Sequence, residues 1–596
     1  MEVALQSIDW VIVAIYLLLS LAIGYYFARR SSSSTEEYFL SGRSLPWWIA
    51  GTSMVATTFA ADTPLAITEL VRQDGIWRNW YWWCIALGGL LGVFFFSRLW
   101  RRAQVLTDNE LIELRYSGKP AALLRGFKAL YFALLYNFIV MGWVINGMSA
   151  VASVVLDVGR SWTVWGCAGI ALLYSVLSGY WGVVITDFIQ FILAMGGAIL
   201  LAVLAVQHFG GVAELLENVR SASGFHADTL SFFPNLPQSS ESFLTSNFFT
   251  FLVFIGIMWW ASHNSDGGGY IIQRMSSCKD ERHALLATLW FNVANYALRV
   301  WPWVIVAVAS IVLFPALAEH PLGDKAGYPS VMTTLCGAGL LGLLVTSFMA
   351  AFMSTISTHL NWGASYLVND VYRRFVKPEA SQTHYVWISR LMTVLVMAGA
   401  ALAAVYMNSI ARAWEFIWAM GCGIGPVLIL RWFWWRINAW SEIAALASSI
   451  VVTIVLEIIA YTQTIQAGLT YSLFSQPPEL FGMTLHIQHK ALIIVPISIV
   501  AWITVTLLTA PVPAAKLEQF YARVHPGGFW PREWLERWGA TSLRSHLFNW
   551  CLGVILVYGA TFGLGFLIFG NFWLGVGLLP IAAVCGWWAV RRAVPA

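Results

Sequence analysis

The sequence contains few charged residues for its length. Asp, Glu, Lys and Arg make up 11% of its 596 residues, whereas soluble domains carry about a quarter. Hydrophobic residues make up 59%, and the mean hydropathy is +0.69. This composition excludes an ordinary soluble domain and predicts a polytopic membrane protein embedded in a lipid bilayer.

Signatures of several other protein classes are missing. The seven cysteines are scattered without a CxxC pair, so neither a disulfide framework nor a zinc site is indicated. The net charge of +4 is small and gives no reason to expect a nucleic-acid partner. We find no nucleophile and base pairing, no phosphate loop and no His/Cys cluster, so we do not expect an enzyme. The acidic start MEVALQSIDW leads into a full-length apolar run, so no cleavable signal peptide is predicted.

Apolar runs long enough to cross a bilayer, about 20 residues each, recur along the whole chain. We count fifteen, near 8–28, 47–73, 80–100, 121–155, 161–178, 180–207, 245–272, 284–315, 331–370, 384–406, 410–432, 439–462, 489–510, 548–570 and 573–590. Lys and Arg follow the odd-numbered runs, for example Arg274 after the seventh and Arg431 after the eleventh. Since basic loops favour the cytoplasm, we predict an external N-terminus and a cytoplasmic C-terminus in a bacterial inner (plasma) membrane. The last two runs, linked by Gly570–Asn571, either both cross or form a re-entrant hairpin.

Two of these runs are interrupted near their middle. In 47–73, Pro64 removes a backbone donor close to Asp62. In 245–272, three glycines, 267–269, follow Asp266 and disfavour a continuous helix. Paired helix breaks indicate the central site of a transporter, and these two open successive sets of five runs, which would be inverted repeats. The alternative is that they are ordinary proline kinks and glycine packing.

The stretch 346–374 carries a column of hydroxyl groups. With 3.6 residues per turn, Ala351, Ser354, Thr355 and Thr358 fall on one helical face, and Ser357 lies beside Ser354. Oxygen ligands suit small hard cations. The alternative is that these hydroxyls bond their own helix or join helices together.

Asp187 is a third acid within an apolar run, early in 180–207. A carboxylate inside a membrane is costly unless it is compensated. Three interpretations of Asp187 remain open: its carboxylate holds a cation, pairs with a basic residue of a neighbouring span, or reaches cytoplasmic water.

Four segments resemble the sodium:solute symporter family, which includes sodium:sugar, sodium:proline and sodium:sialic acid symporters. They are YFLSGRSLPWW (38–48), SGYWGVVITDFIQ (178–190), YIIQR (270–274) and AAFMSTISTHLN with VNDVY (350–372). The resemblance covers roughly 8–435 and implies an all-α LeuT-like fold, a 5+5 inverted-repeat core with extra N- and C-terminal helices. The expected parts are an N-terminal helix and cytoplasmic loop (1–46), a first repeat (47–207), an external loop (208–244), a second repeat (245–435) and C-terminal helices (436–596).

The resemblance also implies sodium as the coupling ion. The shared sodium site of the family maps onto the carbonyls of Ala56, Phe59 and Ala351 and the hydroxyls of Ser354 and Thr355. A register shifted by four would instead use the carbonyls of Ala60 and Thr63. The sialic acid symporter type has a second sodium, which would map onto Asp187, Ser354, Ser357 and Thr358, so two ions per solute are expected on this basis.

The solute is expected between the two broken helices and their neighbours. The substrate candidates are Asp62, Thr63, Asn137, Trp260, His263, Asn264, Asp266 and Glu415, with Asn146, Asn292, Asn295, Trp414 and Trp418 also in reach. The family's sugar transporters carry an Asn-Gln pair just before YIIQR, where this chain has Gly268-Gly269, so those sugar contacts do not transfer. The acids near the breaks would suit a cationic group or a polyol, or would pair with Arg299.

We therefore predict a sodium-coupled secondary active symporter that imports a small polar solute (a sugar, amino acid or carboxylate) by alternating access. The alternatives are a proton-coupled carrier on the same fold and a non-transporting sensor or channel.

Overall fold

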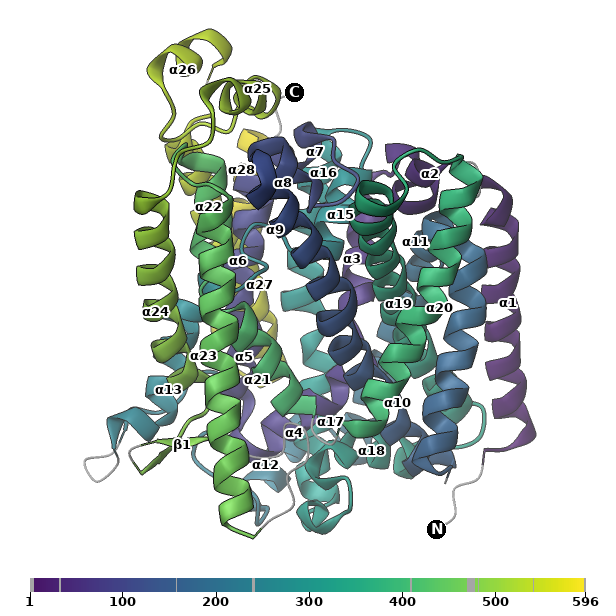
Figure 1. Ribbon diagram of the computed structural model, residues 1–596. Coiled ribbons are helices and arrows are strands. Elements are labelled where there is room, and N and C mark those ends of the chain that lie inside the picture. The colour runs from purple at the N-terminus through teal and green to yellow at the C-terminus, as the bar shows by residue number, and fades with distance from the viewer. Residues whose placement is uncertain are drawn as a thin grey trace.

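The computed structural model describes residues 5–31, 34–156, 158–237, 242–407, 410–468, 477–480, 482–539 and 541–593. Its helices run mostly along one common direction (Figure 1). Within these ranges twelve helices are long and apolar enough to cross a membrane, which confirms the polytopic prediction. The other three predicted spans are the broken runs 47–73 and 245–272 and the shorter apolar helix Ser161–Val176.

The first part of the chain contains twelve helices. They are α1 (Ser7–Ser31), α2 (Thr35–Leu40), α3 (Trp47–Thr58), α4 (Thr63–Asp74), α5 (Trp80–Trp83), α6 (Ile85–Leu91), α7 (Ser97–Ala103), α8 (Glu110–Arg115), α9 (Gly118–Leu130), α10 (Asn137–Leu156), α11 (Arg160–His208) and α12 (Val212–Ser221). Short π-helical segments, Gly92–Phe96 and Tyr131–Tyr136, join α6 to α7 and α9 to α10 without ending the span.

The second part contains ten helices. They are α13 (Asn247–Val253), α14 (Trp259–Ala261), α15 (Gly269–Ser277), α16 (Glu281–Val293), α17 (Val300–Leu313), α18 (Gly327–Leu335), α19 (Leu340–Ser365), α20 (Gln382–Tyr406), α21 (Ile410–Gly421) and α22 (Gly425–Phe433). Three π-helical segments extend α13, α16 and α19: Phe254–Met258, Ala294–Leu298 and Tyr366–Val376.

The last part contains six helices and a short hairpin. The helices are α23 (Ala439–Gln466), α24 (Ile487–Leu508), α25 (Ala514–Val524), α26 (Arg532–Trp538), α27 (Leu543–Ile568) and α28 (Phe572–Ala593). The hairpin consists of β1 (Glu479–Leu480) and β2 (Met483–Thr484). The strands pair antiparallel. With 26 and 22 residues, α27 and α28 are each long enough to span, and they pack against each other.

Both predicted breaks are present. Helix α3 ends at Thr58 and α4 begins at Thr63, so residues 59–62 are non-helical. The second break separates α14 from α15 and includes Gly267 and Gly268 with φ of 128° and 73°. A side chain is strained at such positive φ, which explains why glycines stand there.

Helix α11 consists of two arms that lie side by side. The Tyr174 hydroxyl donates to the Gly182 carbonyl at 3.3 Å and contacts the Thr186 hydroxyl. In one straight helix these partners would lie about 12 and 18 Å further along the axis, beyond the reach of a tyrosine. The arms 160–176 and 180–208 therefore pack as two spans, as the sequence predicts.

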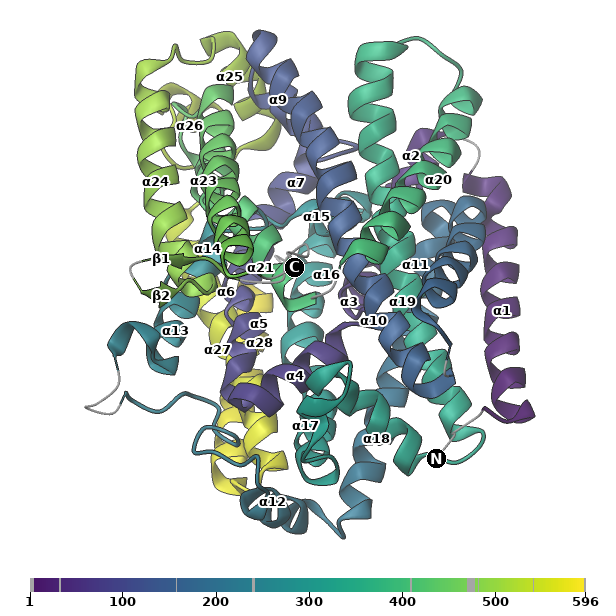
Figure 2. The same ribbon diagram turned by 60° about the horizontal axis from the view of Figure 1, so that its bottom comes forward.

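The most deeply buried helix is α19, in which every residue from Ala350 to Ser365 is buried. Helix α1 lies at one edge of the molecule and α23 and α24 at the opposite edge in both views (Figures 1 and 2). These peripheral helices expose large apolar side chains such as Leu18 and Ile458, as a lipid-facing surface requires. The hydroxyl-bearing helix is thus the centre of the fold.

Candidate functional site

The two helix breaks meet at one cavity of about 280 Å³. Thr57, Thr58, Ala60, Asp62 and Thr63 line it from the first break, and Ser262, His263, Asn264, Gly267 and Gly268 line it from the second. Helices α5, α6, α10, α15, α16, α17, α19 and α21 contribute further lining residues. The volume lies near the lower end of the range for small-molecule sites.

Much of the lining is aromatic. Trp414 of α21 contacts three other rings of the lining: Trp82 at 4.7 Å, Trp143 at 6.0 Å and Tyr81 at 6.2 Å between ring centroids. We call Tyr81, Trp82, Trp143 and Trp414 the aromatic wall. Such rings give a cavity an apolar surface whose π faces attract cations.

Asp62 borders the cavity from the start of α4. It is 2% exposed, and its Oδ1 atom has no hydrogen-bond partner among the described residues. Its backbone packs closely on α10, because a Cβ atom at Gly147 would lie 2.6 Å from the Cα atom of Asp62. Glycine at 147 thus allows the broken segment to approach α10.

Arg299 borders the same cavity just before α17. Its Nη1 atom donates to the Thr58 hydroxyl at 3.0 Å, and its Cζ atom lies 5.4 Å from the centroid of the Trp303 ring. The Thr58 hydroxyl in turn donates to Asn295 Oδ1 at 2.9 Å. Within the described part of the chain no carboxylate pairs with Arg299. The cavity therefore carries one buried charge of each sign.

The hydroxyl column of α19 faces the end of α3. The Thr355 hydroxyl donates to the Thr57 carbonyl at 2.8 Å and to the Ala351 carbonyl at 3.2 Å. Phe59 and Ala351 line a second cavity of about 10 Å³. The carbonyl of Ala56 accepts a hydrogen bond from the Phe59 amide at 3.1 Å. The residues assigned to the shared sodium site are thus all buried and lie around the contact between α3 and α19.

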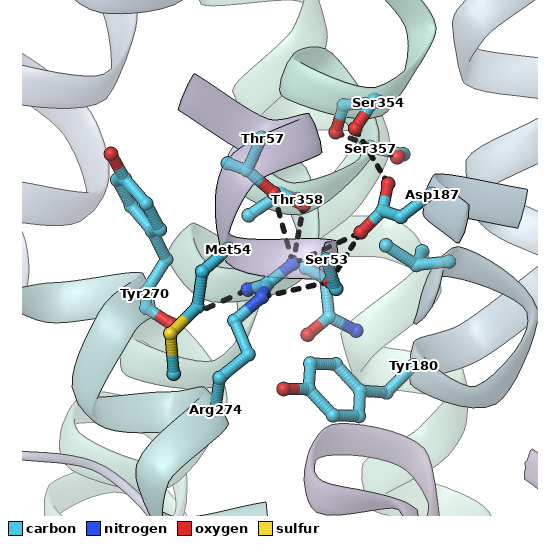
Figure 3. A network of polar contacts seen from close by, with 12 residues as sticks. Ser53, Met54, Thr57, Tyr180, Asp187, Tyr270, Arg274, Ser354, Ser357 and Thr358 are labelled. Atoms are coloured by element: carbon cyan, nitrogen blue, oxygen red, sulfur yellow. Dashed lines mark hydrogen bonds and ion pairs between the residues drawn. The ribbon is translucent and has the colours of Figure 1, made fainter. Parts of the chain in front are cut away.

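Asp187 lies on α11 at the other side of the same column (Figure 3). Its carboxylate accepts from Ser354 at 2.6 Å and from Ser53 at 2.5 Å. Arg274 Nη2 lies 3.4 Å from Asp187 Oδ2, and both side chains are fully buried. The acid therefore pairs with a basic residue of a neighbouring helix, one of the alternatives left open by the sequence.

Arg274 occupies the middle of this network. Its guanidinium donates to the hydroxyls of Thr358 at 2.7 Å, Thr57 at 3.2 Å and Ser53 at 3.0 Å. Figure 3 shows it reaching from α15 between α3, α19 and α11. Ser357 donates to the Ser354 carbonyl at 3.2 Å instead of turning to Asp187. A guanidinium thus lies among the residues assigned to a second sodium.

Two arginines counted as cytoplasmic loop charges are corrected by the structure. Arg274 is 0% exposed and lies inside α15. Arg431 is 3% exposed within α22 and pairs with Asp266 at 2.6 Å and with Glu442 at 3.3 Å. Both were misassigned because an arginine near the end of an apolar run has the same sequence pattern as a loop charge.

The substrate candidates divide into two groups. Asp62, Thr63, His263 and Asn264 line the cavity, as do Asn295, Trp414 and Trp418. The others lie elsewhere in the fold: Asn137 bonds His359, Trp260 bonds the Gly256 carbonyl, Asp266 pairs with Arg431 beside a smaller cavity, and Glu415 pairs with Arg412. Sequence reasoning missed most of the aromatic lining, since tryptophan is abundant throughout the chain.

Comparison with known proteins finds relatives along most of the chain. The model of the sodium:solute symporter family matches residues 38–469. The sodium/glucose cotransporter of Vibrio parahaemolyticus is 25% identical over 500 residues, covering 79% of this chain and 89% of that protein. The sodium/proline symporter of Salmonella typhimurium is 25% identical over 456 residues, covering 74% and 86%.

The fold also matches a solved structure. A Na+-coupled sialic acid symporter, in a substrate-bound outward-open state, aligns with a TM-score of 0.64 at 20% sequence identity. The alignment covers 85% of this chain and 99% of the other. At this identity the match supports the fold, and it agrees with the predicted LeuT-like architecture.

Proposed function

This chain belongs to the sodium:solute symporter family, and from that premise we propose that it imports a small polar solute together with sodium by alternating access. It is an integral multi-pass membrane protein. The observation that carries the proposal is the Thr355 hydroxyl, which joins α19 to the last turn of α3 beside the solute-sized cavity.

The end of α3 is suited to a small cation. A helix leaves its last carbonyls without intrahelical donors, and its C-terminus carries a partial negative charge. Because α3 stops at Thr58 inside the protein, these carbonyls point into the fold next to the hydroxyls of α19. The proposed ligands are the carbonyls of Ala56, Phe59 and Ala351 and the hydroxyls of Ser354 and Thr355.

A sodium ion at this place would tie α3 to α19. Ala60 and Asp62, which line the solute cavity, follow directly after the proposed ligands Ala56 and Phe59, so ion binding would set the position of Asp62. Each charge that moves inward gains about 2.3 kcal/mol per 100 mV of membrane potential. This contact between ion site and cavity is the proposed basis of coupling.

We further propose one sodium per solute. The Arg274 guanidinium already compensates Asp187 and binds Thr358. A sodium ion at this second place would lie beside a fixed positive charge, which costs several kcal/mol at about 4 Å even with a dielectric constant near 20. Two ions would therefore require Arg274 to leave the network.

The proposed orientation places α1's first residue outside and α28's last residue in the cytoplasm. Asp9 of α1 bonds the start of α19, at the lower end in Figure 1, whereas Arg98 of α7 bonds Ala593 at the upper end. Basic side chains such as Arg101 and Arg102 lie at the upper end, which favours the cytoplasm there. The repeats at 47–207 and 245–435 are part of the same proposal.

The test is binding of radioactive sodium to the purified protein. Ser354→Ala removes one proposed oxygen ligand and should weaken sodium binding about tenfold or more, since a bond to a charged group contributes about 1.5–3 kcal/mol. Ser221→Ala, on the exposed end of α12, is the matched control and should bind as wild type does. Unchanged binding in Ser354→Ala would refute the site, and a sodium Hill coefficient near two in the wild type would refute the single ion.

A further inference from the structure

Resting on the symport function proposed above, we propose that the transported solute is a small organic zwitterion, with its positive group at Asp62 and its carboxylate at Arg299. Both side chains line the central cavity, and no ion pair joins them or ties either to another described residue. A buried charge without a partner is costly. Two such charges of opposite sign in one cavity are compensated together by a ligand that carries both.

The surroundings of Asp62 suit an ammonium group. Ala66, one helical turn after Asp62, packs with Trp414 of the aromatic wall. Gly147, which contacts Asp62, lies one turn after Trp143 on α10. The aromatic wall and Asp62 therefore line neighbouring parts of the cavity. Aromatic faces attract ammonium groups, and more strongly when these are desolvated.

The surroundings of Arg299 suit a carboxylate. A guanidinium presents five N–H donors in a planar fork that matches the two oxygens of a carboxylate. Only one of the three guanidinium nitrogens of Arg299 has a hydrogen bond within the described structure, to Thr58. The Trp303 ring lies beside the guanidinium, with its centroid 5.4 Å from the Cζ atom. The remaining donors are available to a solute in the cavity.

The lining fits other solutes less well. A sugar is uncharged and would leave both Asp62 and Arg299 without a compensating charge. A simple organic cation would leave Arg299 uncompensated, and a simple anion would leave Asp62 uncompensated. A zwitterion carries one charge of each sign, which matches the opposite charges of Asp62 and Arg299. A cavity of about 280 Å³ can hold a zwitterion of amino-acid size.

An isosteric set of probes tests the charges separately. Glycine betaine and L-proline are the zwitterions. Choline keeps the trimethylammonium group without the carboxylate, 3,3-dimethylbutyrate replaces the ammonium nitrogen of betaine by carbon, and D-glucose is the polyol. The melting temperature of the purified protein is measured with each probe in sodium chloride and in potassium chloride of equal strength. We expect a zwitterion to raise it in sodium, while choline, dimethylbutyrate and glucose do not.

Two variants should exchange the selectivity. Asp62→Asn should weaken zwitterion binding about 30-fold or more and gain binding of dimethylbutyrate, whereas Arg299→Gln should weaken it similarly and gain binding of choline. A gain of this kind cannot arise from misfolding. Glu217→Gln and Arg220→Gln, which alter exposed side chains of α12, are the matched controls and should bind the probes as wild type does.

The outcomes separate this inference from the symport proposal. If sodium alone raises the melting temperature over potassium but neither zwitterion adds to it, or if glucose does so instead, the solute class is wrong and symport stands. If Asp62→Asn binds zwitterions as wild type does, Asp62 is not the ammonium site and the inference fails. If neither sodium nor a zwitterion has any effect, both proposals are wrong.

Discussion

The buried pair of Arg274 and Asp187 should contribute strongly to the stability of the helix packing. The two side chains lie 3.4 Å apart at zero exposure. At that distance two unit charges attract by about 5 kcal/mol with an effective dielectric constant near 20. Removing one partner also leaves the other buried charge with only uncharged partners such as hydroxyl groups, and breaking a buried ion pair in this way costs about 3–5 kcal/mol. Arg274→Gln and Asp187→Asn should each lower the free energy of unfolding by such amounts.

A double-mutant cycle measures the interaction itself. In the assay, sodium dodecyl sulfate is titrated into the purified protein in mild detergent micelles, and unfolding is monitored by tryptophan fluorescence. Because the double variant leaves no stranded charge, it should be more stable than the sum of the single losses predicts, by about 2–4 kcal/mol. The control cycle uses Arg374 and Glu113, whose side chains are 45% and 23% exposed and should couple by no more than about 1 kcal/mol. A coupling at the buried pair as small as that of the control would refute the ion pair.

Two further predictions concern other parts of the fold. Burial alone would raise the pKa of Glu113, but hydrogen bonds and charges from Arg374 and Arg125 outweigh it and hold that pKa below 4.5. The resulting stabilisation is present above pH 4.5 and is lost as the pH falls through the lower folded pKa. Glu113→Gln should therefore flatten the acid side of the curve of unfolding free energy against pH, and an unchanged acid side would contradict this. Gly147→Ala would place a Cβ atom 2.6 Å from Asp62, so it should displace residues 59–62 and reduce solute uptake into proteoliposomes severalfold while melting within a few degrees of wild type; full uptake would show that the close contact is not needed.

The spans and both breaks could be predicted because their causes are local. About 20 apolar residues, a proline or three glycines decide whether a helix spans or stops, and the broken runs around Asp62 and Gly267 were placed correctly. The resemblance to the sodium:solute symporter family is confirmed by the match over 38–469. It allowed the helix order of the core to be predicted from four short segments.

The directions in which side chains near the helix breaks point could not be predicted in the same way. A helix assigns faces by its period, but residues between two half-helices have none, so His263 reaches the cavity whereas Asp266, three residues later, turns to Arg431. Arg274 was assigned to a loop because the sequence did not show where α15 begins after the break. The depth of the arginine inside the fold was therefore not predicted either. These are consequences of backbone geometry that only the folded chain reveals.

The Arg274 guanidinium is a cation that is covalently part of the chain. Because it is covalently tethered, its local concentration beside Asp187 does not change with the medium, whereas a dissolved ion must be supplied from outside. We therefore expect the packing of α3, α11 and α19 at that level to persist in sodium-free surroundings. We expect a protein with this arrangement to keep its helices assembled when it is purified and stored without sodium. Under the proposed one-ion site, added sodium would then act only at the contact between α3 and α19.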